Sequence, residues 1–301
     1  KVKGANNDGV WNEKGASVLL KIHPAPWETK WAYFVYFIII GVSFFGYLRR
    51  QRRLQIGVIE QQRKEEELEE ARQFQLDMLP KETPELLNLE IAATIQTASE
   101  VGGDYYDFFP EKNGESMYVV VGDATGHGMT AGMMVSITKA GLYGIPAIPP
   151  NEVLKRLNRV IKNIDLGWNR MAINMARFWE NKVEFTSAAM PPIYHYHGDT
   201  GKVDEILIGG LPLGSLMEET FDLIEINLKK EDTLVFISDG LPEAVNNKEE
   251  MLDYEAVKKC VQKNGKLSAE KQKDALINIG RSWLGELQNQ DDITIVVVKK
   301  N

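Results

Sequence analysis

Cysteine is almost absent from this sequence: Cys260 is the only one among 301 residues. A single thiol excludes an internal disulfide framework and any zinc module built on several cysteines. Positive charge is also in deficit, because 35 Lys and Arg face 43 Asp and Glu, which gives a formal net charge of −8. A chain without excess basic charge is not expected to have nucleic acid as its main partner. We find no internal repeat and no low-complexity tract, and the apolar fraction of 44% is typical of globular chains.

One long stretch without charge lies near the start, in residues 31–48, WAYFVYFIIIGVSFFGYL. As a helix it would extend about 27 Å, close to the thickness of the hydrocarbon layer of a bilayer. It is followed at once by four arginines, Arg49, Arg50, Arg52 and Arg53. The positive-inside rule puts that end in the cytoplasm. We therefore predict a single transmembrane helix, and a buried core helix is the weaker alternative because core helices of this length rarely lack charge.

The residues before this helix look incomplete as a folding unit. Residues 1–30 contain one candidate strand, Ala16–Ile22, followed by Pro24 and Pro26. One strand cannot fold alone. We expect residues 1–30 to be the C-terminal remnant of an extracytoplasmic sensor domain whose other parts lie upstream.

A charged segment without proline, residues 49–79, follows the apolar helix. Four of the eight core positions in its heptad frame are apolar, which is a weak coiled-coil pattern. A solvated helix with Glu–Arg pairs is the simple interpretation. We favour a signalling helix that forms a homodimer, because the segment connects a membrane helix to a folded domain. Pro80 and Pro84 end it.

Residues 80–301 alternate between apolar strands and short helices, and we predict that they form the catalytic domain. Several neighbouring strands are close enough in sequence to pair as antiparallel hairpins. This pattern favours an α/β (α+β) sandwich of two antiparallel sheets flanked by helices over a doubly wound fold. The predicted strands are Leu89–Ala98, Ser116–Gly122, Ala172–Trp179, Lys182–Ala188, Phe221–Leu228, Thr233–Ser238 and Ile293–Lys299. The predicted helices are Met129–Tyr143, Glu152–Asn163, Tyr254–Asn264 and Ser268–Leu287.

Aspartates recur where a strand meets a glycine turn or a strand end. They stand in VGGDYYD, VVVGDATGHG, VFISDG and QDDIT. Oxygen ligands of this kind suit hard divalent cations such as Mg²⁺ and Mn²⁺. Any one Asp-Gly pair is better explained as a turn. Four such sites in one domain indicate a cluster of carboxylates that would repel one another unless cations were bound.

These motifs carry a family resemblance. The order VGGDYYDF, GDATGHG, GLPLG, SDGLPEA and DDIT resembles the SpoIIE-type branch of the metal-dependent protein phosphatases, in the protein phosphatase 2C-like superfamily. The similarity runs from about Glu69 to Lys299 and includes the lead-in ARQFQLDMLP. It implies a sandwich of two antiparallel sheets and hydrolysis of phosphoserine or phosphothreonine, often on a regulatory protein of the anti-anti-sigma type. Taken with the apolar helix and its arginines, it predicts a bacterial inner-membrane protein with a cytoplasmic catalytic domain. The shorter segment HPAPWETKWAY is similar to the junction below periplasmic sensor domains.

The resemblance also implies a site for two divalent cations, Mn²⁺ or Mg²⁺. Asp123 would bridge them, and the backbone carbonyl of Ala124 would join one of them. Asp239 and Asp291 would complete one metal site, and Asp104 would serve the other. The ions would activate a bridging water for in-line attack on phosphorus, so that no side-chain nucleophile is needed. Asp123 and Asp239 are therefore the expected catalytic residues.

Details around this site are less constrained by the motifs. Asp291 is preferred to Asp292 because the family ligand is the first residue of that pair. Three glycines, Gly102, Gly103 and Gly126, would let the backbone come close to the ions or adopt strained angles. The segment Gly210–Gly214 is expected to be a structural turn and not a phosphate loop, since it does not open a helix.

The histidines are expected to be mainly structural. His127 lies in a Gly-His-Gly turn, where a structural role is favoured over contact with substrate. His195 and His197 alternate along a short strand and should share one face, but we do not expect them to bind metal. Where the family often has Ala-Gly-His-Pro-Pro, this chain has Met190 in place of the histidine.

Other classes of protein fit less well. A cysteine-dependent phosphatase needs an arginine six residues after its cysteine, and Lys266 stands there. A nucleotide cyclase begins with a similar Gly-Gly-Asp, but Tyr105 replaces the next acidic residue and Asp239 is left unexplained. A receptor or scaffold with a decayed phosphatase-like domain remains an alternative, although all four expected aspartates are present.

Overall fold

The computed structural model describes residues 1–301 except 16, 18, 22–24, 86–87, 99–100 and 112–113. The chain divides into two compact units, Lys1–Arg63 and Lys64–Asn301. Because the placement of the units relative to each other is not determined, each is described by itself.

The first unit contains little regular structure before its long helix. An isolated bridge joins Ala5 and Trp11, and a 3-10 helix, η1, covers Pro26–Glu28. The strand predicted at Ala16–Ile22 falls partly on positions outside the described residues, and the described residues 17 and 19–21 are not in a strand.

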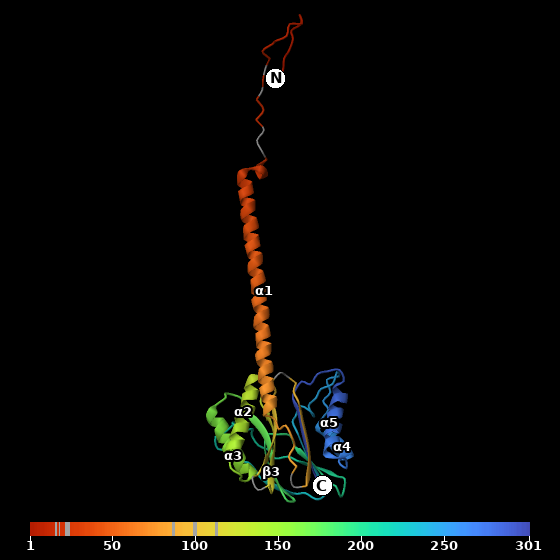
Figure 1. The fold of residues 1–301 in the computed structure, drawn as a ribbon. Coiled ribbons are helices and arrows are strands. Elements are labelled where there is room, and N and C mark those ends of the chain that lie inside the picture. The colour runs from red at the N-terminus through yellow and green to blue at the C-terminus, as the bar shows by residue number, and fades with distance from the viewer. Residues whose placement is uncertain (16, 18, 22–24, 86–87, 99–100, 112–113) are drawn as a thin grey trace. The chain divides into compact units, whose positions relative to one another are not determined.

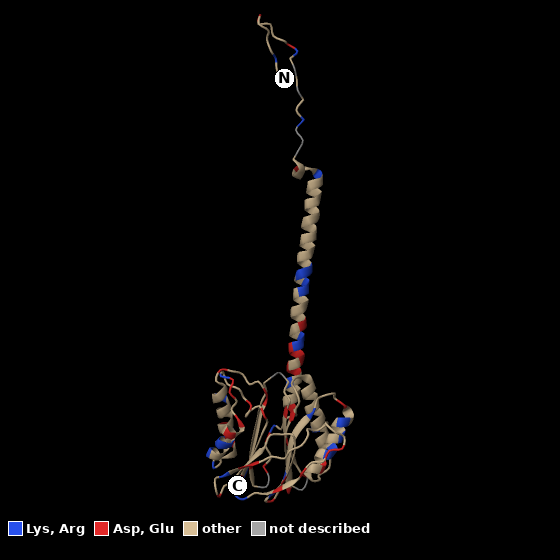
Figure 2. Cartoon of the chain, turned by 180° about the vertical axis from the view of Figure 1, so that it is seen from behind, with Lys and Arg blue, Asp and Glu red and all other residues tan. Residues whose placement is uncertain are grey.

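Helix α1, Lys30–Met78, is continuous from the apolar segment through the charged one and crosses the boundary between the units. Within the described part of the chain it is the one helix long and apolar enough to span a membrane, and none of its apolar window is buried. Figure 2 shows a basic band on α1 followed by mixed charges nearer its end. The bounds predicted within residues 31–79 therefore correspond to no break in the backbone.

The second unit is built on two five-stranded sheets in which every described pairing is antiparallel. The first sheet has the order β1 (Leu89–Gln96), β10 (Ile293–Lys300), β9 (Thr233–Ile237), β6 (Ile193–Tyr196) and β7 (Val203–Ile206). The second has the order β2 (Asp104–Pro110), β3 (Ser116–Ala124), β4 (Met171–Trp179), β5 (Lys182–Ala188) and β8 (Ile224–Asn227). The predicted sandwich of antiparallel sheets is confirmed.

Three apolar layers hold this sandwich together, and Figure 1 shows the helices on either side of the sheets. Between the sheets lies a core that includes Val119, Phe185 and Phe236. Helices α2 (Met129–Gly144) and α3 (Pro150–Ile164) cover the outer face of the β2–β8 sheet. Helices α4 (Tyr254–Asn264) and α5 (Ala269–Leu284) cover the outer face of the other sheet. Each helix buries one apolar stripe, which is how amphipathic helices stabilise a sheet.

The sequence missed two strands in this unit. Strand β2 has the sequence DYYDFFP. Its two aspartates interrupt the apolar pattern from which strands are predicted, although most of its residues are buried. Strand β7 reads VDEI, which is too short and too polar to predict, and it forms through pairing with β6. Both are cases in which contacts with a neighbouring strand decide the local structure.

Candidate active site

Two of the predicted ligands lie opposite each other on neighbouring strands. Asp104 begins β2, Asp123 lies near the end of β3, and the antiparallel register pairs them directly. Side chains of directly paired residues stand on the same face of a sheet about 5 Å apart. Asp104 is buried, and among the described residues its Oδ2 atom has no hydrogen-bond partner.

The other two predicted ligands come from the opposite sheet. Asp239 follows β9 and Asp291 precedes β10. The Ser238 hydroxyl joins these strand ends: it donates to the carbonyl of Asp292 at 3.2 Å and accepts from the Thr294 N–H at 2.9 Å. The ends of β9 and β10 therefore hold their aspartates beside each other.

The electrostatics indicate that the four carboxyl groups converge. The pKa of Asp123 is raised to about 8, first by burial and then by repulsion from Asp239 and Asp291. Burial also raises the pKa of Asp104 well above its ordinary value, with Asp123 as the next cause. The pKa of Asp239 is raised by burial and by Asp291. Carboxylates that are costly to ionise together are poised to accept cations.

The neighbouring residues Asp291 and Asp292 differ in burial and in their hydrogen bonds. Asp292 is buried, and its carboxylate accepts N–H groups from Ala98 and Gly103, both at 2.7 Å, and from Asp104 at 3.3 Å. Asp291 is exposed, and it accepts the N–H of Asp292 at 2.8 Å. Asp292 accepts three N–H groups and Asp291 one, and Asp291 acts more strongly on the pKa of Asp123, so this geometry favours Asp291 as a metal ligand.

Close backbone approach around the site requires glycine. A Cβ atom at Gly103 would lie 2.6 Å from the carbonyl oxygen of Ala124, the predicted backbone ligand. A Cβ atom at Gly102 would lie 2.3 Å from Oδ2 of Asp292. Gly126 has a φ of +83° and needs glycine for its conformation. The strained angle expected at Gly126 is confirmed, and Gly102 and Gly103 lie close to the Asp292 carboxylate and the Ala124 carbonyl.

Other predicted features have structural roles. His127 is exposed in its turn. The Gly210–Gly214 segment forms a bridge in which Leu213 and Met171 exchange backbone hydrogen bonds of 2.8 and 3.2 Å. Met190 is buried in the core between the sheets. The prediction that Gly210–Gly214 is a structural turn is therefore confirmed.

Sequence reasoning missed one residue that supports the site. Gln75, near the end of α1, is 5% exposed. Its Nε2 donates to the carbonyl of Gly102 at 2.8 Å, and its Oε1 accepts the N–H of Gly102 at 3.0 Å. We call this pair of bonds the Gln75 clasp. Nothing in the spacing of the charged helix identifies Gln75 in advance.

The residues present fit a divalent metal centre. They supply hard oxygen ligands from both sheets, a carbonyl at Ala124 that Gly103 leaves approachable, and an unpaired buried oxygen on Asp104. Buried polar atoms are otherwise nearly always hydrogen-bonded. The Oδ2 atom of Asp104 is one of several unpaired buried atoms among the described residues, and its place opposite Asp123 makes it available to a cation.

Comparison with known proteins gives consistent matches. The family model described as Stage II sporulation protein E (SpoIIE) matches residues 113–301. The phosphoserine phosphatase RsbU of Bacillus subtilis (strain 168) is 29% identical over 273 residues, which cover 88% of this chain and 78% of that protein.

Solved structures show the same fold. The SiaA-PP2C domain of Pseudomonas aeruginosa has a TM-score of 0.71 at 18% identity, covering 80% of this chain and 98% of that one. The PP2C phosphatase domain of SpoIIE from Bacillus subtilis, solved with a fragment of its regulatory domain, has a TM-score of 0.60 at 20% identity and covers 72% of this chain and 64% of that one.

Proposed function

We propose, from the premise that this chain belongs to the SpoIIE family, that it is a metal-dependent protein phosphatase acting on phosphoserine or phosphothreonine. The observation that carries the proposal is the electrostatic coupling of Asp123, which is paired with Asp104 across β2 and β3, to Asp239 and Asp291 from the other sheet. The relative RsbU, which is named as a phosphoserine phosphatase, supports the reaction class. The proposed substrate is a phosphorylated regulatory protein of the anti-anti-sigma type, as the family resemblance implies.

The proposed reaction assigns separate roles to the bound ions and to the residues that hold them. Asp104, Asp123, Asp239, Asp291 and the carbonyl of Ala124 would hold two divalent cations, Mn²⁺ or Mg²⁺. When bound, such ions supply Lewis-acid activation of a water molecule and neutralise charge on phosphoryl oxygens. The protein contributes position: the β2–β3 register fixes one pair of carboxylates, and the β9 and β10 ends fix the other. No side-chain nucleophile is required.

The direct test is turnover of a phosphoserine peptide by the purified full chain in a mild detergent. We expect activity with Mn²⁺ or Mg²⁺ and its loss when both are chelated, because the carboxylates cannot assemble a reactive centre alone. Activity that survives chelation would contradict the mechanism. If the chain is inactive with every metal tested, the alternative of a receptor or scaffold with a decayed phosphatase-like domain is favoured. If it cyclises a guanine nucleotide, the alternative of a nucleotide cyclase is favoured.

We further propose that α1 anchors the protein in the bacterial inner membrane by a single pass through residues 31–48. The uncharged run and the arginines that follow it support this placement. The catalytic unit would then lie in the cytoplasm. Residues 49–79 are proposed to pair with a second copy as a homodimer.

The Gln75 clasp offers a route by which α1 could act on the site. It holds Gly102, which is followed by Gly103 and the ligand Asp104. A second connection lies nearby: the Lys139 Nζ atom donates at 2.6 Å both to the carbonyl of Met78 and to the carboxylate of Asp107 in β2. Movement of the end of α1 would therefore be transmitted to the strand that begins with Asp104.

Gln75→Ala is expected to lower Mn²⁺ affinity or activity by about 10- to 100-fold, the usual cost of losing a residue that positions a ligand. Two hydrogen bonds to buried backbone groups would be lost, so Asp104 would be held less firmly. The measurement is Mn²⁺-dependent turnover together with calorimetric Mn²⁺ binding. Gln73→Ala is the matched control, since Gln73 is exposed two positions earlier on the same helix. Equal Mn²⁺ affinity and turnover in both variants would rule out coupling through the clasp.

A further inference from the structure

A second group of metal-binding side chains lies away from the four aspartates. His195 is in β6, His197 follows that strand, and Asp232 directly precedes β9. One potential ligand atom from each of the three lies within 4.8 Å of the others. Asp232 stands at the opposite end of β9 from Asp239, about 20 Å away along an extended strand. The group is therefore separate from the proposed catalytic centre.

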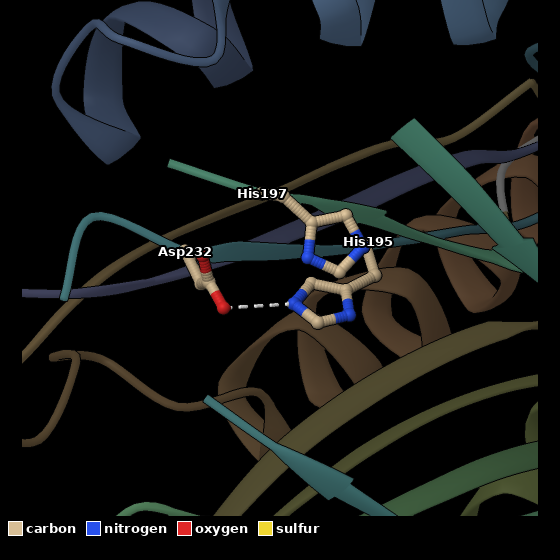
Figure 3. Close-up of side chains that lie close together, drawn as sticks. All are labelled: His195, His197 and Asp232. Atoms are coloured by element: carbon tan, nitrogen blue, oxygen red, sulfur yellow. Dashed lines mark hydrogen bonds and ion pairs between the residues drawn. The ribbon is translucent and has the colours of Figure 1, made fainter. Parts of the chain in front are cut away.

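The two histidines share one face, as their alternation predicts. Their ring centroids are 4.0 Å apart. Figure 3 shows a nitrogen of each ring on the side of Asp232. The Nε2 atom of His195 lies 3.1 Å from Oδ2 of Asp232. Without an ion this contact is a hydrogen bond, and an incoming ion would have to displace its proton. The separation is close to the spacing of about 3.3 Å that two ligands have on a tetrahedral ion with bonds near 2.0–2.1 Å.

A carboxylate behind His197 selects which of its nitrogens can bind. Its Nε2 lies 2.8 Å from Oδ2 of Asp204 in β7, a geometry that places the proton on Nε2. The lone pair is then on Nδ1. Histidine ligands in proteins usually donate their second nitrogen to a carboxylate or carbonyl in this way. Asp204 would therefore orient His197 as a ligand without binding the metal itself.

Asp232 is held in place before any ion arrives. Its Oδ1 accepts the N–H of Gly198 at 2.8 Å, and its Oδ2 accepts the N–H of Lys229 at 2.9 Å. The Asp232 side chain is 1% exposed and that of His195 is 6% exposed, whereas that of His197 is 26% exposed. The site thus has a rigid buried side and one side open to solvent. An ion could enter there and keep a water molecule as a fourth ligand.

We propose that His195, His197 and Asp232 form a second metal site that binds Zn²⁺ or a similar ion preferring imidazole nitrogen. Two nitrogens and one carboxylate suit zinc better than Mg²⁺ or Mn²⁺, which prefer oxygen. A bound ion would connect β6 to the start of β9 and stabilise this edge of the sheet.

The proposal can be tested on the full chain in detergent, with excess Mg²⁺ to occupy the carboxylate centre. Zn²⁺ would be titrated in competition with a chromophoric chelator, and Co²⁺ would be added separately to read the coordination from its visible absorption. We expect one tightly bound zinc per chain and a cobalt spectrum of tetrahedral type. Wild-type protein that binds no zinc under these conditions would overturn the proposal.

Variants distinguish this site from adventitious binding. His197→Ala should weaken zinc binding by at least about 100-fold, and Asp204→Asn, at a mostly exposed position that should not affect folding, by about 10- to 100-fold. His127→Ala is the control for a histidine elsewhere and should leave the affinity unchanged. Zinc should also raise the Tm of the wild type but not that of His197→Ala. Unchanged zinc affinity in both the His197 and Asp204 variants would refute the assignment.

Discussion

Asp123→Asn should lower turnover of a phosphoserine peptide by at least about 10³-fold at saturating Mn²⁺, because it removes the carboxylate proposed to bridge two ions. Asp123 is the member of the site that interacts with aspartates from both sheets: it pairs with Asp104 across β2 and β3, and its pKa responds to Asp239 and Asp291. Asparagine keeps the size of the side chain and loses its charge. The measurements are kcat and the stoichiometry of Mn²⁺ binding.

Asp222→Asn is the matched control for this prediction, because it removes an exposed carboxylate outside the cluster. It should keep wild-type activity. Retention of more than about a tenth of the activity in Asp123→Asn would contradict the assigned role, since loss of a bridging charge cannot be so mild.

Measuring Tm over a range of pH shows whether Asp123→Asn is folded and whether ionisation of Asp123 destabilises the metal-free wild type. The pKa of Asp123 in the metal-free folded protein is about 8, raised from 3.8. Stability from such a group is fully present below the unfolded pKa and is lost as the pH rises through the folded pKa. In chelator, the Tm of the wild type should therefore fall as pH increases from about 4 to 8 and level off above that, and the Tm of Asp123→Asn should fall less over the same interval.

Gly240→Ala is expected to reduce activity by about 10²-fold and the free energy of unfolding by about 1–3 kcal/mol. A Cβ atom at Gly240 would lie 2.1 Å from the carbonyl oxygen of Asp292. The atom that it meets belongs to the backbone and cannot rotate away, so the turn after Asp239 must shift relative to the start of β10. The two ligands Asp239 and Asp291 would then lose their mutual placement.

The control for Gly240→Ala is Gly144→Ala, where an added Cβ would meet nothing within 4 Å. Chemical denaturation and peptide turnover should be measured on both variants. If Gly240→Ala stays within about threefold of the wild type in activity while Gly144→Ala behaves normally, then close packing at Gly240 does not position the site.

The sequence was informative where local pattern decides structure. A single Asp-Gly such as that in VFISDG is better explained as a turn, but four aspartates at strand ends or glycine turns in one domain could be recognised as a group. The sandwich could be predicted because neighbouring strands such as β4 and β5 are joined by short turns. The resemblance then assigned roles that composition alone could not.

The sequence was silent where distant parts of the chain meet. Asp292 braces Gly103 across 189 positions, and Gln75 holds Gly102 across 27. Neither contact can be predicted from the neighbouring sequence. The two partners are far apart in the chain, and only the packing of the whole domain brings them together. The same reason explains why Asp232 could not be connected with His195 and His197 before the start of β9 was placed beside β6.

The position of β10 has a consequence for the timing of biosynthesis. This strand contains residues 293–300, yet it lies inside its sheet between β1 and β9. A nascent chain that has emerged only as far as residue 290 lacks Asp291 and the strand that joins β1 to the rest of its sheet. Such a chain can neither close the sandwich nor complete the carboxylate cluster. We therefore expect an unfinished polypeptide on the ribosome to be inactive, because the order of the strands delays completion of the proposed carboxylate cluster until β10 is made.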